Sequence, residues 1–433
     1  MATARPHHRA DYMLVPPLRA FALAALLVGM PLAWWARSVS GVEGKTLTAI
    51  FLCTSALLAA RWTNLLQFKV CGPHAALGIL IFAQFFFIGL ALTATPKIDI
   101  EGILYYSFTI LAAVCIFSME REDCEGLAVA LCWIAILTAI YCVTIFLAEI
   151  VEFGGRPGNL SSNQLGTAGV CGIVAGLLLL VRAGRHGVVS TVLYMMAIGA
   201  GSLVLLVALS RSSYIAVVAM LMAAGIGALG RRILGRNEPR DPSAKRSSQL
   251  ATLMVLLAGL VFFLFATETG RQINERLTFA AEHVARGALT YLNESGTSGR
   301  HDESAGLRLK DLEYGFSDFE TMPHGYKHRY IHFPFLSAFN DLGIVFGIFF
   351  FLFVFAFPVA IIAHCLLTPD VSFDRRFIAL LYFVTLKALF LHGDHYAFLT
   401  YLFAAALYRF CTPELNARRL QRQPVASKRP SHA

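Results

Sequence analysis

Residues 343–367 have the sequence GIVFGIFFFLFVFAFPVAIIAHCLL, which contains no Asp, Glu, Lys or Arg. Residues 250–267, LATLMVLLAGLVFFLFAT, form a second uncharged apolar run. A helix needs about 20 apolar residues to cross a hydrocarbon layer of about 30 Å. A buried strand rarely exceeds about eight residues. Both runs therefore predict membrane-spanning helices.

The composition of the whole chain points the same way. Of its 433 residues, 57% are hydrophobic and only 15% are charged, and the mean hydropathy is +0.63. A soluble domain carries about 25% charged residues. The nine cysteines include no CxxC pair, so no disulfide framework or zinc site is indicated. These features exclude a soluble enzyme, a secreted disulfide scaffold and a β-barrel.

Apolar blocks of membrane-spanning length recur along the chain and predict an all-α polytopic membrane protein with about twelve transmembrane helices. The predicted spans are 16–36, 46–66, 75–95, 102–119, 127–150, 165–182, 188–209, 212–230, 250–268, 337–365, 377–391 and 395–411. The chain then divides into spans one to nine (1–268), a large outer loop (269–336), spans ten to twelve (337–411) and a basic tail (412–433).

The formal net charge of +9 reflects basic residues placed mainly between spans. Clusters lie at 231–246 and after the last span, which is the pattern of the positive-inside rule rather than of a nucleic-acid groove. We therefore expect both termini on the cytoplasmic side and no nucleic-acid partner. On this assignment the inner connections also hold Arg61, Lys69, Arg121, Arg182, Arg185, Arg375 and Arg376.

The outer loop is too long to be a simple connection. Its residues Ile273, Leu277, Ala280, Val284 and Ala288 recur at helical spacing between charged residues, which predicts an amphipathic helix at the membrane surface. Loops of this length in compact proteins are functional or disordered. The aromatic residues at 314–330 favour function.

Several ionisable residues lie on the predicted outer side, where a charge at membrane depth is costly and therefore a candidate for function. They are Arg156, Arg211, Arg300, His328, His332 and Lys387. Each also has a structural interpretation: a topology charge, a hydrogen-bonded interfacial residue or, for Lys387, a buried pair with Asp394. A transporter remains an alternative, although the sequence lacks the internal symmetry typical of transporters.

The chemistry of these side chains favours an anionic substrate. Arginine presents a planar fork that suits phosphate oxygens, and histidine titrates near neutral pH and can accept a proton from a sugar hydroxyl. The sequence contains no DxD pair, P-loop or HExxH motif. The residues thus indicate a membrane enzyme acting on an anionic, lipid-linked substrate at the outer face.

At these residues the chain resembles the bacterial O-antigen ligase and O-antigen polymerase superfamily, and it is most like the ligases. Three of the family's short motifs have counterparts in Arg156-Pro157-Gly158 followed by Asn163, in Ser210-Arg211-Ser212 and in Ser298-Gly299-Arg300. The family's His-Asn-x-x-Leu-x-x-Leu-x-Glu-x-Gly pattern is matched over 332–343. It departs at Phe333, where a polar residue is usual, at Phe339 and at Asp341.

The resemblance implies a glycosyltransferase of the C-type membrane class in the bacterial inner membrane, with its site on the periplasmic face. The donor would be a glycan on undecaprenyl diphosphate and the acceptor a sugar hydroxyl of lipid A–core. It implies no cofactor and no metal. O-antigen polymerase, which shares these motifs and this donor, stays an alternative.

Roles for individual residues follow from that donor. We expect His332 to be the catalytic base and an in-line attack to invert the anomeric centre. The predicted substrate-binding residues are Arg156, Asn163, Arg211, Arg300, His328 and Lys387.

Overall fold

The computed structural model describes the helical bundle and part of the predicted outer loop. The described residues are 15–28, 44–66, 111–120, 123–124, 126–153, 162–182, 188–208, 210–233, 275, 278, 282, 310–313, 315, 333–368, 371–384 and 398–411. Every regular element among them is a helix. Four helices are long and apolar enough to cross a membrane: Leu127–Thr144, Val188–Ala208, Ser212–Arg231 and Gly347–Leu367. This agrees with the predicted helical membrane class.

Close packing joins α8 (Leu127–Phe153), α9 (Ser162–Arg182) and α10 (Val188–Ala208). A Cβ at Gly172 would lie 2.2 Å from the Cβ of Ala135 in α8, and one at Gly201 in α10 would lie 2.6 Å from the carbonyl oxygen of Gly169 in α9. Neither distance permits a side chain. Glycines at these crossings therefore let the helices approach closely, as is common in membrane helix pairs.

A second group contains α1 (Leu18–Val28), α3 (Gly44–Ala59), α4 (Trp62–Leu66) and the helical residues 111–118. Helix α20 (Phe398–Cys411) touches α1 but packs mainly against the helices that precede it near the end of the chain. The prediction of one helix over 46–66 is wrong, because the helix breaks at Ala60 and Arg61. Arg61 binds both carboxylates of a neighbouring turn, with its Nε 2.9 Å from Asp123 and its Nη1 2.6 Å from Glu120. Its backbone N–H donates to Ser118 Oγ at 2.9 Å, so the break carries its own hydrogen bonds.

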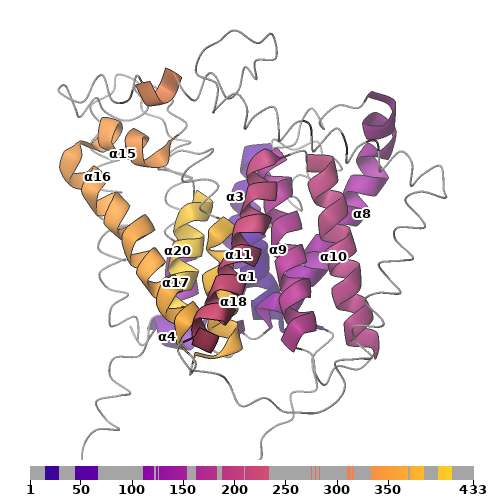
Figure 1. Cartoon of the computed structure of the whole chain (residues 1–433), viewed down its shortest axis with the longest axis horizontal. Helices are drawn as coiled ribbons and strands as arrows, with labels where there is room; N and C mark the ends of the chain where they lie inside the picture. Colours follow the sequence, from indigo (N-terminus) through magenta and orange to yellow (C-terminus); the bar gives the residue numbers. More distant parts are fainter. Residues whose placement is uncertain are drawn as a thin grey trace, which may run out of the picture.

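The predicted span 337–365 is also wrong in its bounds. The chain forms α15 (Pro334–Leu342), turns at Gly343 with φ of 84°, and continues as α16 (Ile344–Phe351), a π-helical turn (Leu352–Ala356) and α17 (Phe357–Leu367). Glycine adopts a positive φ without steric cost. Figure 1 shows α16 and α17 as one long helix crossing the bundle, with α15 at its upper end.

Pro358 explains the π-helical turn. Proline has no N–H, so the carbonyls four and five residues earlier, Val354 and Phe353, cannot accept from it. Both carbonyls accept from tyrosine hydroxyls instead. Tyr408 Oη donates to Phe353 O at 2.9 Å, and Tyr382 Oη donates to Val354 O. The two tyrosines thereby connect the π-helical turn to α20 and to the end of α18 (Phe373–Leu381).

Most described arginines lie at one end of the bundle, which we call the basic end. There Arg231 of α11 (Arg211–Ile233) donates to Leu366 O at the end of α17, Arg409 Nε donates to Met119 O at 2.6 Å, and Cys411 Sγ donates to Arg375 O at 3.2 Å. Helix α1 begins at this end, since Pro17 and Ala20 contact Gly126 before α8, and α20 ends there. The segments outside residues 15–411 are not described.

The remaining predicted spans differ in how far the structure describes them. Helix α18 begins at Phe373, four residues before the predicted 377, and α20 begins at Phe398. Of the predicted span 102–119, residues 111–118 are helical. The predicted spans 75–95 and 250–268 lie outside the described residues, so the number of twelve stays a prediction.

Candidate functional site

The turn between α10 and α11 lies at the end of the bundle opposite the basic end, here called the Ser210 end. Ser210 precedes α11, and its carbonyl accepts from the N–H of Ser213 at 3.0 Å and of Tyr214 at 3.2 Å. Serine is favoured at such a capping position. The helix therefore starts at Arg211, within the motif that resembles the O-antigen family.

Three serine hydroxyls form a buried cluster at this turn. Ser213 Oγ donates to Ser210 Oγ at 2.9 Å, and the Oγ atoms of Ser210 and Ser212 are 3.1 Å apart. The side chains are 4%, 8% and 0% exposed for Ser210, Ser212 and Ser213. Their mutual hydrogen bonds satisfy polar groups that would be costly to bury alone.

The serine cluster is packed against the start of α9. A Cβ added to Gly166 would lie 2.1 Å from Ser213 Oγ, 2.8 Å from Ser213 Cβ and 3.2 Å from Ser210 Cβ. Only glycine fits this position without displacing α11. Asn163 is the second residue of α9, within one turn of Gly166. Two family-like motifs, 47 residues apart at Asn163 and Ser210, thus lie at neighbouring helix starts.

Tyr214 ties α11 back to α10. Its Oη donates to Leu205 O at 3.0 Å. Leu205 is among the last four residues of α10, whose carbonyls have no partner within their own helix. The turn is therefore braced on both sides, by Gly166 in α9 and by Leu205 in α10, which fixes where the backbone of Arg211 lies.

Helix α15 lies at the same end of the bundle. Gly227 and Gly230 of α11 pack against Leu366 and Leu367 of α17, so α11 and the α16–α17 helix both finish at the basic end. Both must therefore begin at the Ser210 end, as Figure 1 shows. Pro334 opens α15 two residues after His332.

Part of the predicted outer loop covers α15. A Cβ at Gly315 would lie 2.1 Å from Leu336 Cδ2, so the helical segment 310–313 and Gly315 lie directly on this helix. Below it, Phe335 makes edge-on contacts with Phe350, Phe351 and Phe355 at 5.4–5.6 Å between ring centroids. These contacts hold α15 between the loop and α16.

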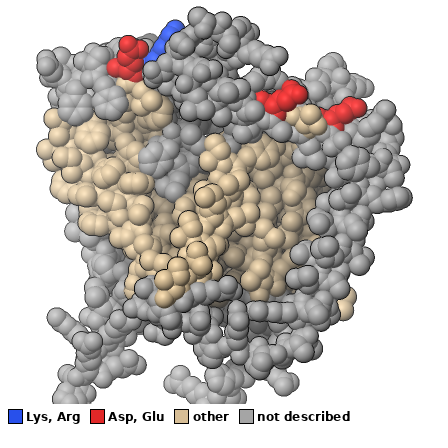
Figure 2. Space-filling view, viewed as in Figure 1, with Lys and Arg blue, Asp and Glu red and all other residues tan. Residues whose placement is uncertain are grey.

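Charged side chains mark the Ser210 end of the surface. Glu275, Glu282, Lys310 and Glu313 are exposed. Figure 2 shows the coloured acidic and basic side chains at the upper edge of the viewed face, above a tan surface formed by the helices. Glu275, Thr278 and Glu282 are helical, as the predicted amphipathic helix requires, whereas its predicted apolar residues lie outside the described residues.

The predicted site residues are described only in part. Arg211 and Asn163 have described backbones, at the first residue of α11 and the second of α9. Arg156, Arg300, His328, His332 and Lys387 lie outside the described residues. The sequence did not point to Gly166 or Ser213, whose importance is visible only once α9 and α11 are packed together.

Arg211 stands apart from the other described arginines. Those in the bundle lie at the basic end, on the elements that begin or finish there: Arg19, Arg61, Arg182, Arg231, Arg232, Arg375, Arg376 and Arg409. Within the described part of the chain, no group of three or more His, Cys, Asp or Glu could hold a metal ion.

Comparison with known proteins gives no relative. No protein-family model matches the chain, no curated protein is detectably similar to it, and no solved structure matches it.

Proposed function

We propose that the chain is a membrane glycosyltransferase of the O-antigen ligase type, which transfers O-polysaccharide from undecaprenyl diphosphate to a sugar hydroxyl of lipid A–core. The observation that supports it best is the place of Arg211. This residue starts a helix at a buried, braced turn, at the opposite end from the other described bundle arginines.

The charge distribution supports an outward-facing Ser210 end. Arginine concentrates on the cytoplasmic side of membrane proteins, which assigns the basic end to the cytoplasm and the Ser210 end to the periplasm. Arg211 then stands on the side that the rule disfavours. An arginine kept there against this bias is a candidate for binding an anion.

The proposed roles of the arginines and of His332 follow from the chemistry of the diphosphate leaving group. Arg211, with Arg156 and Arg300, would neutralise the diphosphate, because guanidinium groups bind phosphate oxygens in pairs. Diphosphate leaves readily, so the harder step is removal of a proton from the acceptor hydroxyl. His332 would accept that proton, and a positioned base contributes about 10² to 10⁴ in rate.

The proposal is tested in a deletion strain complemented with the wild-type gene, with Arg211→Lys, or with Arg19→Lys as a matched control at the basic end. Lipopolysaccharide is separated on gels. We expect bare core, with polymer accumulating on the lipid carrier, in the deletion strain and in Arg211→Lys, because lysine keeps the charge but loses the fork. Arg19→Lys should restore the wild-type ladder.

Other gel patterns would identify the alternatives. Core carrying a single repeat unit in the deletion strain would indicate a polymerase. A transfer assay in detergent, with purified lipid-linked donor and acceptor, separates an enzyme from a transporter. Failure of the wild-type protein to form a new glycosidic product would refute the proposal.

A further inference from the structure

The π-helical turn divides the long helix into α16 and α17, and these two halves are held differently. Helix α17 is fixed to its neighbours at the basic end. A Cβ added to Gly227 of α11 would lie 3.0 Å from Leu366 Cβ, and Arg231 Nη1 donates to Leu366 O. The buried Cys365 has its Sγ 3.9 Å from Cys411 O of α20. Contacts with α11 and α20 therefore hold α17 in place.

Helix α16 lies at the surface of the bundle. Among the described elements it packs mainly on α15 and on the π-helical turn, and an edge-on contact joins Phe350 to Tyr401 of α20, with 6.4 Å between ring centroids. Apolar side chains gain no hydrophobic stabilisation by leaving lipid for protein, so an exposed apolar face does not press α16 against the bundle. The exposed residues of α16 are Ile344, Val345, Ile348, Phe349 and Phe351.

Helices α15 and α16 are packed tightly on each other. A Cβ added to Gly347 of α16 would lie 2.3 Å from Phe339 Cδ1 of α15, so only glycine fits at this contact. The Phe335 ring packs edge-on against Phe350 and Phe351. The two helices therefore form one rigid body, which we call the α15–α16 arm.

The chemistry of the π-helical turn favours bending at this point. In a regular helix each carbonyl accepts from the N–H four residues later. Pro358 has no N–H, and Phe353 O and Val354 O accept from Tyr408 and Tyr382 instead. A change in the direction of α16 therefore has no N–H···O bond from residue 358 to break.

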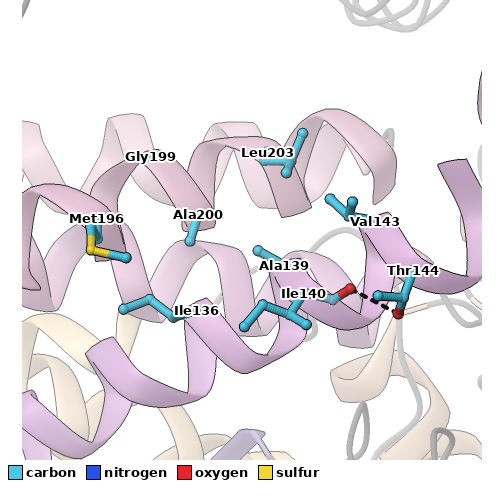
Figure 3. A pocket seen from close by; sticks show the side chains of 9 residues that line it. All are labelled: Ile136, Ala139, Ile140, Val143, Thr144, Met196, Gly199, Ala200 and Leu203. Atoms are coloured by element: carbon cyan, nitrogen blue, oxygen red, sulfur yellow. Dashed lines mark hydrogen bonds between the residues drawn. The ribbon is translucent and has the colours of Figure 1, made fainter.

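The tyrosine hydroxyls also fix the position of the turn. In α8, Thr144 Oγ1 donates to Ile140 O at 2.9 Å within its own helix (Figure 3), so this bond moves with the helix. A hydroxyl that comes from another part of the chain instead holds its carbonyl against the bundle. Tyr382 and Tyr408 thus keep the π-helical turn in place while the helix above it changes direction.

A change in direction at the turn moves the far end of the arm by a measurable distance. From Phe351 to Ile344 the helix rises about 10 Å, so a change of about 20° in its bend moves Ile344 by about 4 Å. Pro334, the first residue of α15, follows the proposed base His332 by two residues. Arg211 stays in place, because its turn is braced by α9 and α10.

We infer that the α15–α16 arm pivots about the π-helical turn and so opens and closes the Ser210 end of the bundle. An enzyme whose donor and acceptor are both lipid-linked glycans must admit two bulky substrates and then bring them together, and closure of a hinged element serves both needs. This purpose rests on the proposed glycosyltransferase function, whereas the pivot itself does not.

Double electron–electron resonance on protein in vesicles of phosphatidylethanolamine and phosphatidylglycerol tests the pivot. Nitroxides are attached to a keto amino acid, so that the nine native cysteines stay unlabelled. One pair joins Val345 of α16 to Ile215 of α11, and the matched pair joins Ala363 of α17 to Ile226 of α11; all four residues are exposed. We expect the Val345–Ile215 distances to spread about 4 Å further than the Ala363–Ile226 distances.

Two proline substitutions separate the turn from the rest of the arm. Pro358→Ala supplies an N–H at the turn, and we expect it to narrow the Val345–Ile215 distribution toward the width of the α17 pair. Pro334→Ala makes the same change at the first residue of α15, where an N–H has no partner within the helix, so it should leave the distribution unchanged.

Two results would overturn the pivot. The first is an equal width of the two distance distributions in wild-type protein, a measurement that needs no variant to fold. The second is equal narrowing by Pro334→Ala and Pro358→Ala, which would place the motion elsewhere in the arm.

A further measurement tests the connection to the proposed site. Undecaprenyl diphosphate added to the vesicles should shift the Val345–Ile215 distribution toward shorter distances, and Arg211→Lys should weaken this shift. A distribution that ignores the diphosphate would overturn the opening and closing role, and the lipopolysaccharide gels would still decide the proposed function. Conversely, failed transfer by a protein whose arm moves would refute the proposed function and leave the pivot standing.

Discussion

Removing the hydroxyl of Tyr408 should destabilise the protein through a carbonyl on another helix. In Tyr408→Phe the ring stays, but Phe353 O loses the donor that lies 2.9 Å away. Leaving this partly buried carbonyl without its donor costs about 1 to 3 kcal/mol, and within a membrane no water replaces the donor. We expect the free energy of unfolding to fall by about this amount, and Tyr382→Phe to act similarly through Val354 O.

Measuring the same two tyrosine substitutions in a Pro358→Ala background tests whether the missing proline N–H is the reason that the carbonyls need the tyrosines. The substitution introduces one N–H, which can donate to Val354 O in α-helical geometry or to Phe353 O in π-helical geometry, but not to both. The cost of one of the two Tyr→Phe changes should therefore shrink by about 1 kcal/mol or more in the Pro358→Ala background, while the other stays. A double-mutant cycle measures this coupling.

Unfolding by SDS titration in mixed micelles, with thermal unfolding as a check, gives the required free energies. Ser202→Ala is the control, because Ser202 Oγ donates to Ile198 O at 2.8 Å along its own helix and its loss leaves no carbonyl without a donor. Equal costs of both tyrosine changes with and without Pro358 would refute the reasoning.

Three further predictions concern the ends of the bundle and the chemistry. Gly166→Ala should lower the free energy of unfolding by about 1 to 3 kcal/mol through overpacking. Gly225→Ala is the control, because the added Cβ meets no atom within 4 Å, and it should raise the free energy of unfolding by up to about 1 kcal/mol. A higher melting temperature for Gly166→Ala than for Gly225→Ala would contradict the packing seen at α9. Asp123→Ala should cost about 1 to 3 kcal/mol, because the partly buried Arg61 loses one of its two carboxylates and keeps only Glu120, and an unchanged melting temperature would show that Glu120 alone suffices. His332→Ala should abolish glycan transfer with expression intact, and normal transfer by this variant would remove His332 from the proposed mechanism. EDTA should leave transfer unchanged in the wild-type protein, and loss of transfer that Mg²⁺ restores would show that a metal is needed.

The sequence predicted the long helices well, because apolar runs of sufficient length have few alternatives in a membrane. The predicted spans 188–209 and 212–230 differ by one to three residues from α10 and α11. The break at Arg61 was not predicted, because its signal is a salt bridge to residues about 60 positions away. The bounds of 337–365 failed for a local reason, since Gly343 interrupts an otherwise continuous apolar stretch.

The candidate site was less accessible to sequence reasoning. Ser210-Arg211-Ser212 could be recognised as a motif, but its contact with Gly166 depends on how α9 and α11 pack. Likewise, Pro358 signals a helix irregularity by itself, yet nothing near it indicates that Tyr382 and Tyr408 supply the missing donors. Pairings between distant residues are a property of the packed helices and not of any local pattern.

The short turn between α10 and α11 has a consequence for how the protein is made. Only Leu209 and Ser210 separate the two helices, and a turn this short leads us to expect that α10 and α11 insert into the bilayer together. With the proposed orientation, in which the Ser210 end faces the periplasm, the pair enters the bilayer as a hairpin with Arg211 at its leading tip. Carrying an arginine through the bilayer centre costs about 2.5 to 3.5 kcal/mol on insertion scales. The two uncharged apolar flanks offset that cost, and Arg231 and Arg232 at the trailing end keep the hairpin from passing through.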